Sequence, residues 1–280
     1  MRTSEWIQTG FAALLAIAAW ITLLGPAPLP KSRRWTITVL ALAAFALVAI
    51  ALTICARLPP DAASILRDWL PVPLFLIPYW QAGQFFLKPN PAIEGRLLAI
   101  DRRLLPSASA KSGTDRNSIG LLLEMAYLSC YPLVPAGLLA LYITGQRAQT
   151  ASFWLVVLIA TYICYAVTPF VPALPPRSLI AEIPNPITKA KSVNKGRIFN
   201  RWILHHGSIH AISFPSAHVA SAFAVALVLL YYSPLAGILF LLIAIAISLG
   251  AVIGRYHYAL DVLAGAALAL VVFLVSYPWL

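Results

Sequence analysis

The sequence is a series of long apolar runs separated by shorter polar segments. Each run is close to or longer than the roughly 17–25 residues that an α-helix needs to cross the hydrocarbon core of a bilayer. The runs lie at 6–25, 35–56, 69–87, 119–143, 152–171, 216–232, 235–253 and 258–279. This pattern predicts an all-α fold, a polytopic membrane helical bundle with about six to eight transmembrane helices.

Two segments leave alternatives open. The run at 69–87 contains three prolines, Pro71, Pro73 and Pro78. It therefore either crosses the membrane or forms a re-entrant or interfacial segment. Residues 93–105 place apolar side chains at helical spacing among charged ones, which predicts either an interfacial amphipathic helix or a solvated connector.

Composition supports a membrane protein. Apolar residues make up 61% of the chain and charged residues 10%, with a mean hydropathy of +0.84, which excludes an ordinary soluble globular protein. Cys55, Cys130 and Cys164 all fall within predicted spans, which argues against a disulfide framework and against a thiolate metal site. Glu124 is the one acidic residue well inside a span, and we expect it to snorkel to the nearby interface.

The net charge of +11 is unevenly distributed. Loops 26–34, 88–118 and 172–212, with the turn at Arg255, carry most of the lysines and arginines. With eight spans these segments share one side of the membrane, which the positive-inside rule makes cytoplasmic, so we expect a multi-pass protein of the cell's inner membrane. A site for a phosphorylated lipid also needs a basic face. The basic residues therefore leave open on which side of the membrane such a site lies. Basic residues scattered over membrane loops argue against a nucleic-acid partner.

Candidate chemistry is concentrated between residues 213 and 261. Ser-Phe-Pro-Ser-Ala-His opens this stretch and Arg-Tyr-His-Tyr-Ala-Leu-Asp closes it. His257 and Asp261 share a face if their segment is helical, and a carboxylate beside an imidazole fixes its tautomer and favours its cationic form. Pro215 suits the first turn of a helix, and the free N–H groups of such a turn near Ser216 would attract an anion.

The loop after the fifth run begins with closely spaced prolines and leads to Arg177. We expect the prolines to keep this stretch out of a helix and to present the guanidinium, which suits phosphate oxygens, at the membrane surface. Eight spans would place all the polar candidates at four helix ends on one face. These candidates are Arg177, Ser216, His218, Arg255, His257 and Asp261. Together they predict a site for a phosphorylated ligand.

The motifs resemble those of a known family. Pro-Ser-Ala-His at 215–218 resembles the P-S-G-H motif of the type-2 phosphatidic acid phosphatase superfamily, which includes vanadium haloperoxidases. His-Tyr-Ala-Leu-Asp-Val-Leu-Ala-Gly at 257–265 resembles the end of its third motif, and Pro-Pro-Arg at 175–177 is similar to its first motif. The resemblance implies a catalytic helical core at 119–280, preceded at 1–118 by transmembrane helices and the amphipathic segment.

The resemblance also implies a role for each matched residue. His257 would be the nucleophile that forms a phosphohistidine, Asp261 would orient it, and His218 would protonate the leaving group. Arg177 would bind phosphate, with Ser216 beside it. No cofactor or metal is implied, and the expected partners are the bilayer and a phosphorylated lipid substrate.

Departures from the family pattern concern phosphate binding. Phe170 and Ala251 stand where the family usually has Lys and Arg, and we expect Arg255 to replace the missing arginine. The shortened third motif resembles that of inositolphosphorylceramide-synthase-like phosphotransferases. The expected function is hydrolysis of a phosphatidic acid-like or polyprenyl diphosphate lipid, and the alternative is transfer of a phospho-headgroup to an acceptor lipid or alcohol. A non-enzymatic transporter is disfavoured because the polar groups cluster at one interface.

Overall fold

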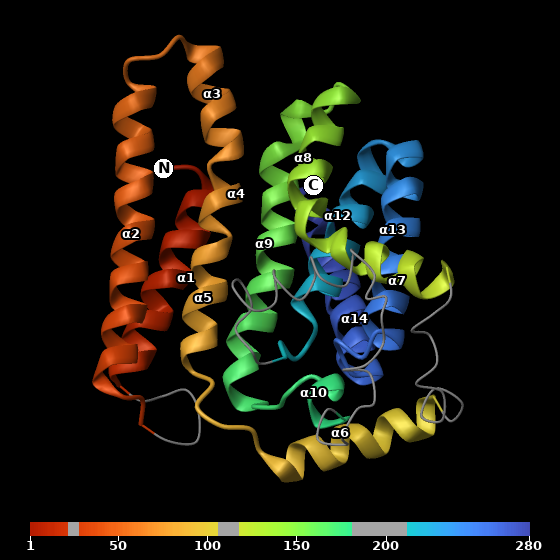
Figure 1. Ribbon diagram of the computed structural model, residues 1–280. Coiled ribbons are helices and arrows are strands. Elements are labelled where there is room, and N and C mark those ends of the chain that lie inside the picture. The colour runs from red at the N-terminus through yellow and green to blue at the C-terminus, as the bar shows by residue number, and fades with distance from the viewer. Residues whose placement is uncertain (22–27, 106–117, 181–211) are drawn as a thin grey trace.

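The described part of the chain is built of helices. The computed structural model describes residues 1–21, 28–105, 118–180 and 212–280, and all regular elements within these ranges are α-helices or short 3-10 helices. Most of them run alongside one another, as in a membrane helical bundle (Figure 1). The predicted all-α membrane fold is confirmed.

The N-terminal helices form one side of the bundle. α1 (Thr3–Trp20) packs on α2 (Lys31–Cys55), and both contact a column made of α3 (Pro60–Trp69), α4 (Pro71–Leu74) and α5 (Leu76–Gln84). The column breaks where prolines remove backbone donors. Figure 1 shows it running in one direction beside α2, so the proline-rich segment passes along the bundle and does not turn back.

One helix lies across the bundle. α6 (Pro91–Leu104) runs along its lower end in Figure 1, and the side chain of Asn90 caps its N-terminus. Of the two alternatives for residues 93–105, the helix is the one that forms. Its apolar face, however, packs on the protein, because Leu97 belongs to a buried cluster with Ala173 and Tyr258.

The predicted span at 119–143 is two helices joined by a sharp bend. α7 (Ser118–Leu128) and α8 (Cys130–Ile143) differ in direction by 61°. The bend lies at Ser129, three positions before Pro132. A proline ring clashes with the carbonyl four residues earlier, so the helix cannot continue unbroken through this point.

The rest of the bundle is arranged around one central helix. α9 (Thr150–Val167), which two 3-10 turns flank, and the five-residue α10 (Pro176–Ile180) precede it. The central helix is α12 (Ala217–Tyr232), followed by α13 (Pro234–Ile253) and α14 (Ala259–Ser276).

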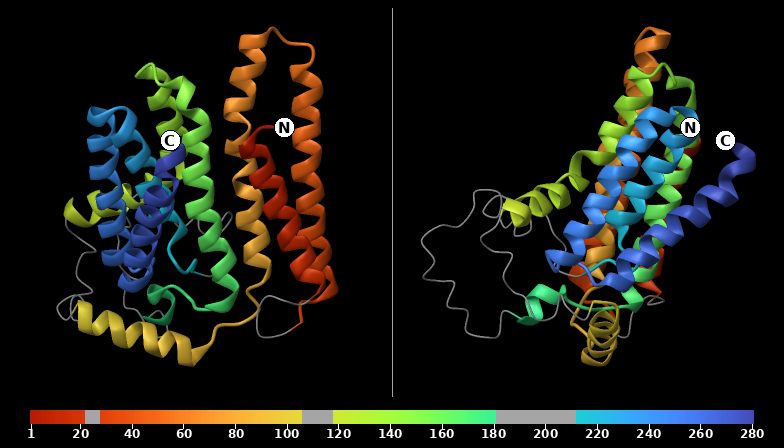
Figure 2. Two further views of the ribbon diagram at one scale, coloured as in Figure 1. Left: turned by 180° about the vertical axis from the view of Figure 1, so that it is seen from behind. Right: turned by 90° about the vertical axis from the view of Figure 1, so that its right-hand side faces the viewer.

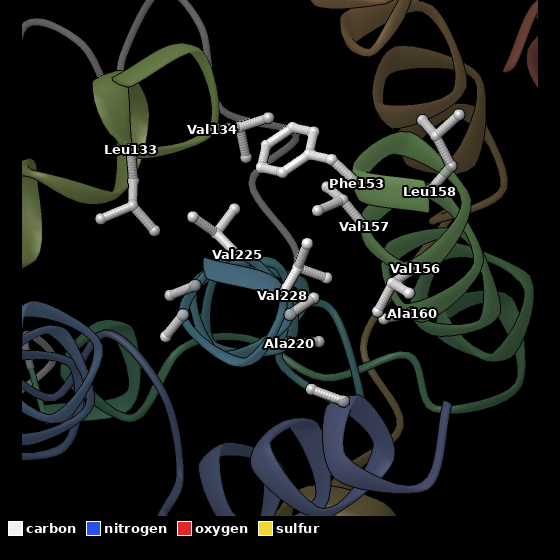
Figure 3. Close-up of a cluster of buried hydrophobic side chains, with 14 of the residues drawn as sticks. Leu133, Val134, Phe153, Val156, Val157, Leu158, Ala160, Ala220, Val225 and Val228 are labelled. Carbon is white, nitrogen blue, oxygen red and sulfur yellow. The ribbon is translucent and has the colours of Figure 1, made fainter. Parts of the chain in front are cut away.

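α12 contacts α8, α9, α13 and α14, and it is apolar on nearly all sides, as a helix enclosed by others must be. Figure 3 shows Val225 and Val228 of α12 facing Val134 of α8 and Phe153 and Val157 of α9. The view from behind in Figure 2 shows the same grouping, with the N-terminal helices to one side.

Within the described ranges, four helical segments are long and apolar enough to span a bilayer: 31–55, 147–170, 234–253 and 259–279. The bent pair α7–α8 makes a fifth if it counts as one span. α12 is apolar but has only 16 residues, and neither α1 nor the α3–α5 column belongs to this set. Large apolar side chains such as Leu42 and Leu242 point outward from the spanning helices, as lipid-facing residues do.

Buried carboxylates join the N-terminal helices to one another and to α8. The guanidinium of Arg67 donates two hydrogen bonds of 2.8 Å to Glu5 of α1, and the Tyr142 hydroxyl of α8 donates one of 2.6 Å to Asp68. Buried carboxylates require such partners, because desolvation penalises an isolated charge.

The domain boundary expected after residue 118 stays a prediction.

Candidate active site

The polar candidates of the sequence come together at one end of the bundle. The end of α13 and the starts of α12 and α14 meet there, close to α10 and α6 (Figure 1). The contacts below join Arg177, Ser216, His218, Arg255, His257 and Asp261 into one cluster. The segments flanking the α12–α13 hairpin carry the second and third motifs, so the hairpin brings these two motifs together.

His257 and Asp261 form a buried pair. Nδ1 of His257 lies 2.9 Å from Oδ2 of Asp261, and the two side chains are 5% and 0% exposed. Asp261 lies in the first turn of α14, and His257 lies just before that helix begins. Because Nδ1 faces the carboxylate, Nε2 is the ring nitrogen left to reach a substrate.

His218 is the neighbour of this pair. It is the second residue of α12, and the centroid of its ring lies 5.8 Å from that of His257, with the ring planes at 70°. Its Nδ1 is buried without a hydrogen-bond partner among the described residues. The rings of Tyr127 and Tyr131 approach it edge-on, at 6.0 and 5.8 Å.

Ser216 joins the second motif to the third. Its N–H donates to the backbone oxygen of Asp261 at 2.9 Å, and its hydroxyl oxygen caps α12 by accepting a long hydrogen bond from Val219. The N–H of Ala217 donates to Ser213 Oγ at 3.0 Å. These two N–H groups therefore already have partners inside the protein.

Pro215 lies outside the helix that it was expected to begin. α12 starts at Ala217 with Ser216 as its N-cap, so the proline precedes the cap. A serine is a strong N-cap because its side-chain oxygen satisfies a free N–H of the first turn. That preference sets the start of the helix here.

α14 approaches the start of α12 very closely. A Cβ atom on Gly265 would lie 2.5 Å from the backbone oxygen of Ser216, a distance that real side chains do not reach. Only glycine allows this approach. The last residue of the third motif therefore maintains the contact between the two helices that carry His218 and Asp261.

Arg177 lies against the third motif. Its N–H donates to the backbone oxygen of Arg255 at 3.1 Å, and its Cζ lies 4.2 Å from the ring centroid of Tyr256. The prolines keep residues 171–175 out of a helix, as expected, but Pro176 is the first residue of the short helix α10, which contains Arg177. Proline is well tolerated there, where its missing N–H has no helical partner anyway. Arg255 itself adopts a positive φ of 56° in the turn after α13.

Tyr256 is a site residue that sequence reasoning missed. Its ring stacks on Tyr127 at a centroid distance of 4.1 Å, and its hydroxyl donates to the carboxylate of Glu124. Arg177 and Tyr127 thus cover the two faces of one ring. Glu124, expected to snorkel, instead accepts this hydrogen bond. The sequence signal that could have pointed to this part of the site is Glu124, because an acidic residue inside a span is often associated with function.

No three His, Cys, Asp or Glu side chains cluster with metal-ligand spacing in the part of the chain that the structure describes. The basic residues between 189 and 201 lie outside the described ranges.

Comparison with known proteins places the chain in a family. The sequence model of the PAP2 superfamily matches residues 95–275, which is more than half of the chain and includes every candidate residue above. No curated protein and no solved structure matches. The family match agrees with the resemblance of the three motifs and with the geometry that joins them. The chain belongs to the PAP2 superfamily.

Proposed function

We propose that this PAP2 superfamily member is an integral-membrane lipid phosphatase of the inner membrane that acts through a phosphohistidine intermediate. Membership of the superfamily supports a phosphatase-type activity. The finer proposal depends mainly on one observation, the 2.9 Å contact between Nδ1 of His257 and Asp261 with His218 beside it. The proposed substrate is a phosphomonoester or diphosphate lipid, phosphatidic acid-like or a polyprenyl diphosphate.

In the first step, Nε2 of neutral His257 attacks phosphorus. An N–P bond forms while the bond from phosphorus to the leaving oxygen breaks, and His218 gives that oxygen its proton. The imidazole becomes cationic as it is phosphorylated. Asp261 stabilises this charge through the Nδ1–H that it accepts.

Phosphoryl transfer demands positive charge around the equatorial oxygens. Arg177 and Arg255 supply it in this proposal, with the Ser216 hydroxyl as an additional donor. Both arginines are attached to the turn that carries His257, because the N–H of Arg177 bonds to the carbonyl of Arg255. A guanidinium offers a planar fork of donors that matches phosphate geometry.

In the second step, His218 removes a proton from water, and the resulting hydroxide attacks the phosphohistidine. Inorganic phosphate leaves and His257 returns to its neutral state. The arginines provide the charge that metal ions supply in other phosphatases. We expect chelation by EDTA to leave the rate unchanged and vanadate to inhibit, because vanadate mimics five-coordinate phosphorus.

Transfer of a phospho-headgroup is the second candidate. The shortened third motif and the 4% exposure of His257 favour it, because a nucleophile shielded from bulk water suits an acceptor alcohol. The two steps are the same, except that the acceptor hydroxyl replaces water.

The test is an assay of the purified protein with a panel of lipid phosphates, with and without acceptor lipids. Release of inorganic phosphate without acceptor supports the phosphatase. Turnover that requires an acceptor supports the transferase. If folded protein forms neither product from any lipid, both the phosphatase and the transferase proposals are contradicted.

A further inference from the structure

The face of α6 that packs on the protein carries two carboxylates, Glu94 and Asp101. They are seven residues apart, about two helical turns, and therefore project from the same side of the helix. Glu94 is 7% exposed and Asp101 is half-buried. Buried carboxylates need specific partners, and the partners of both belong to the catalytic segments.

Asp101 caps α14 from another helix. Its Oδ1 accepts a hydrogen bond of 2.7 Å from the N–H of Ala259, the first residue of α14. The N-cap residue, Tyr258, makes no side-chain capping bond, so Asp101 supplies the acceptor that the local sequence lacks. Ala259 lies two residues after His257 and two before Asp261, so this bond holds the centre of the catalytic pair.

Glu94 holds the segment that leads to Arg177. Its Oε1 accepts a hydrogen bond of 2.9 Å from the N–H of Leu174. The carbonyl of Leu174 in turn accepts one of 3.0 Å from the hydroxyl of Tyr258. The loop before Arg177 and the turn after His257 are thus bonded to α6 and to each other.

We propose that Glu94 and Asp101 are positioning residues, through which α6 holds the His257–Asp261 pair and Arg177 in their catalytic arrangement. The inference rests on the proposed function. Without its acceptor, the N–H of Ala259 is left unpaired and the first turn of α14 loosens, which displaces Asp261 relative to His257. Displacement of reacting groups by about 1 Å can reduce a rate by roughly 100-fold.

The test compares Asp101→Ala with Asp101→Asn in the full-length protein. We expect Asp101→Ala to lower kcat by about 10- to 100-fold and to change KM by less than about 3-fold. Asp101→Asn retains an oxygen that accepts from Ala259, so it should recover most of kcat. Asp61→Ala removes an exposed carboxylate from α3 and serves as the matched control, with unchanged kcat. For Glu94, Glu94→Ala and Glu94→Gln should behave as the corresponding Asp101 variants do.

Hydrogen exchange gives a readout that does not depend on turnover. Amides at 257–262 should exchange faster in Asp101→Ala than in wild type or Asp101→Asn, while those of α2 stay the same. Unchanged exchange there, or a kcat of Asp101→Ala within about 2-fold of wild type, overturns the proposal. A loss of kcat matched by loss of folded protein also overturns it. If wild type turns over no lipid phosphate, the proposed function fails and exchange alone decides the positioning role.

Discussion

The guanidinium of Arg177 lies over the ring of Tyr256, with 4.2 Å between Cζ and the ring centroid. Tyr256 immediately precedes His257, so this contact places the positive charge of the first motif beside the proposed nucleophile of the third. Tyr127 covers the other face of the ring and Glu124 accepts from its hydroxyl. A ring held in this way fixes the position of the arginine.

The first prediction concerns this ring. Tyr256→Ala removes a cation–π contact worth about 0.5–2 kcal/mol, so the inhibition constant for vanadate should rise by roughly 2- to 30-fold. Tyr256→Phe keeps the ring and should stay close to wild type in vanadate affinity. Tyr277→Ala, at an exposed tyrosine, is the control and should change nothing. Equal losses in the Phe and Ala variants would show that the hydroxyl, and not the ring, matters.

The second prediction concerns the carboxylate. Asp261→Asn removes the charge that stabilises the imidazolium, and it allows the wrong imidazole tautomer, because an amide nitrogen can donate to Nδ1. We expect kcat to fall by about 10²–10⁴-fold. Steady-state phosphate release at saturating lipid measures the effect, with Asp61→Asn as control. A decrease of less than about 10-fold is incompatible with the role given to Asp261.

The third prediction concerns packing between α12 and α14. Gly265→Ala places a methyl group against the Ser216 carbonyl, so the helices must separate, at a cost of about 1–3 kcal/mol. Both Tm in detergent and kcat should fall. Gly10→Ala is the matched control, because nothing lies within 4 Å of its added Cβ, and it should leave Tm unchanged or raise it. Similar behaviour of the two variants would refute the close-approach argument.

Whether the sequence alone predicts a contact of this site depends on how far apart its two residues are along the chain. His257 and Asp261 are four residues apart, so their spacing suggests the pair, although His257 lies just before α14 and not within it. The order of the spans suggests that His218 and Arg177 lie at the same end. The contacts of Tyr256 with Arg177 and of Asp101 with Ala259 join segments whose side chains meet only in the packed bundle. No spacing along the chain encodes them.

The effect of a proline on the local structure is the feature that the sequence predicts least well. Pro176 is compatible both with a loop and with the first position of a helix, and only the docking of α10 onto the turn at Arg255 selects the helix. The apolar run at 119–143 satisfies the length criterion for one span, and Pro132 and Pro135 within it predict a kink. The structure has a sharp bend of 61°, which divides the run into α7 and α8.

The fourth prediction concerns pH. Burial raises the pKa of the Asp101 carboxyl, while the N–H of Ala259 and the guanidinium of Arg255 act in the opposite direction. A carboxyl with a raised folded-state pKa stabilises the fold below its unfolded pKa of about 3.9 and loses that contribution as pH rises through the folded value. Asp101 also interacts electrostatically with the carboxyl of Asp261 and with the hydroxyl of Tyr258.

The Tm of wild type should therefore fall relative to that of Asp101→Asn as pH is raised through this window. Because Asp101 is only half-buried, solvent screening keeps the change small. Thermal unfolding of both proteins in detergent across a pH series measures it. A wild-type Tm that rises relative to the variant over the same interval would reverse the sign that burial requires.

The proposed mechanism requires that His257 be the nucleophile, so a trapped intermediate must carry the phosphoryl group on its ring. Wild type mixed with a phosphate-labelled lipid and quenched in alkali, where phosphohistidine survives, is digested and analysed by mass spectrometry. We predict a phosphoryl group on His257, its absence in His257→Ala, and a turnover of that variant at least about 10³-fold below wild type. A label on another residue, or turnover by His257→Ala at the wild-type rate, would contradict the account.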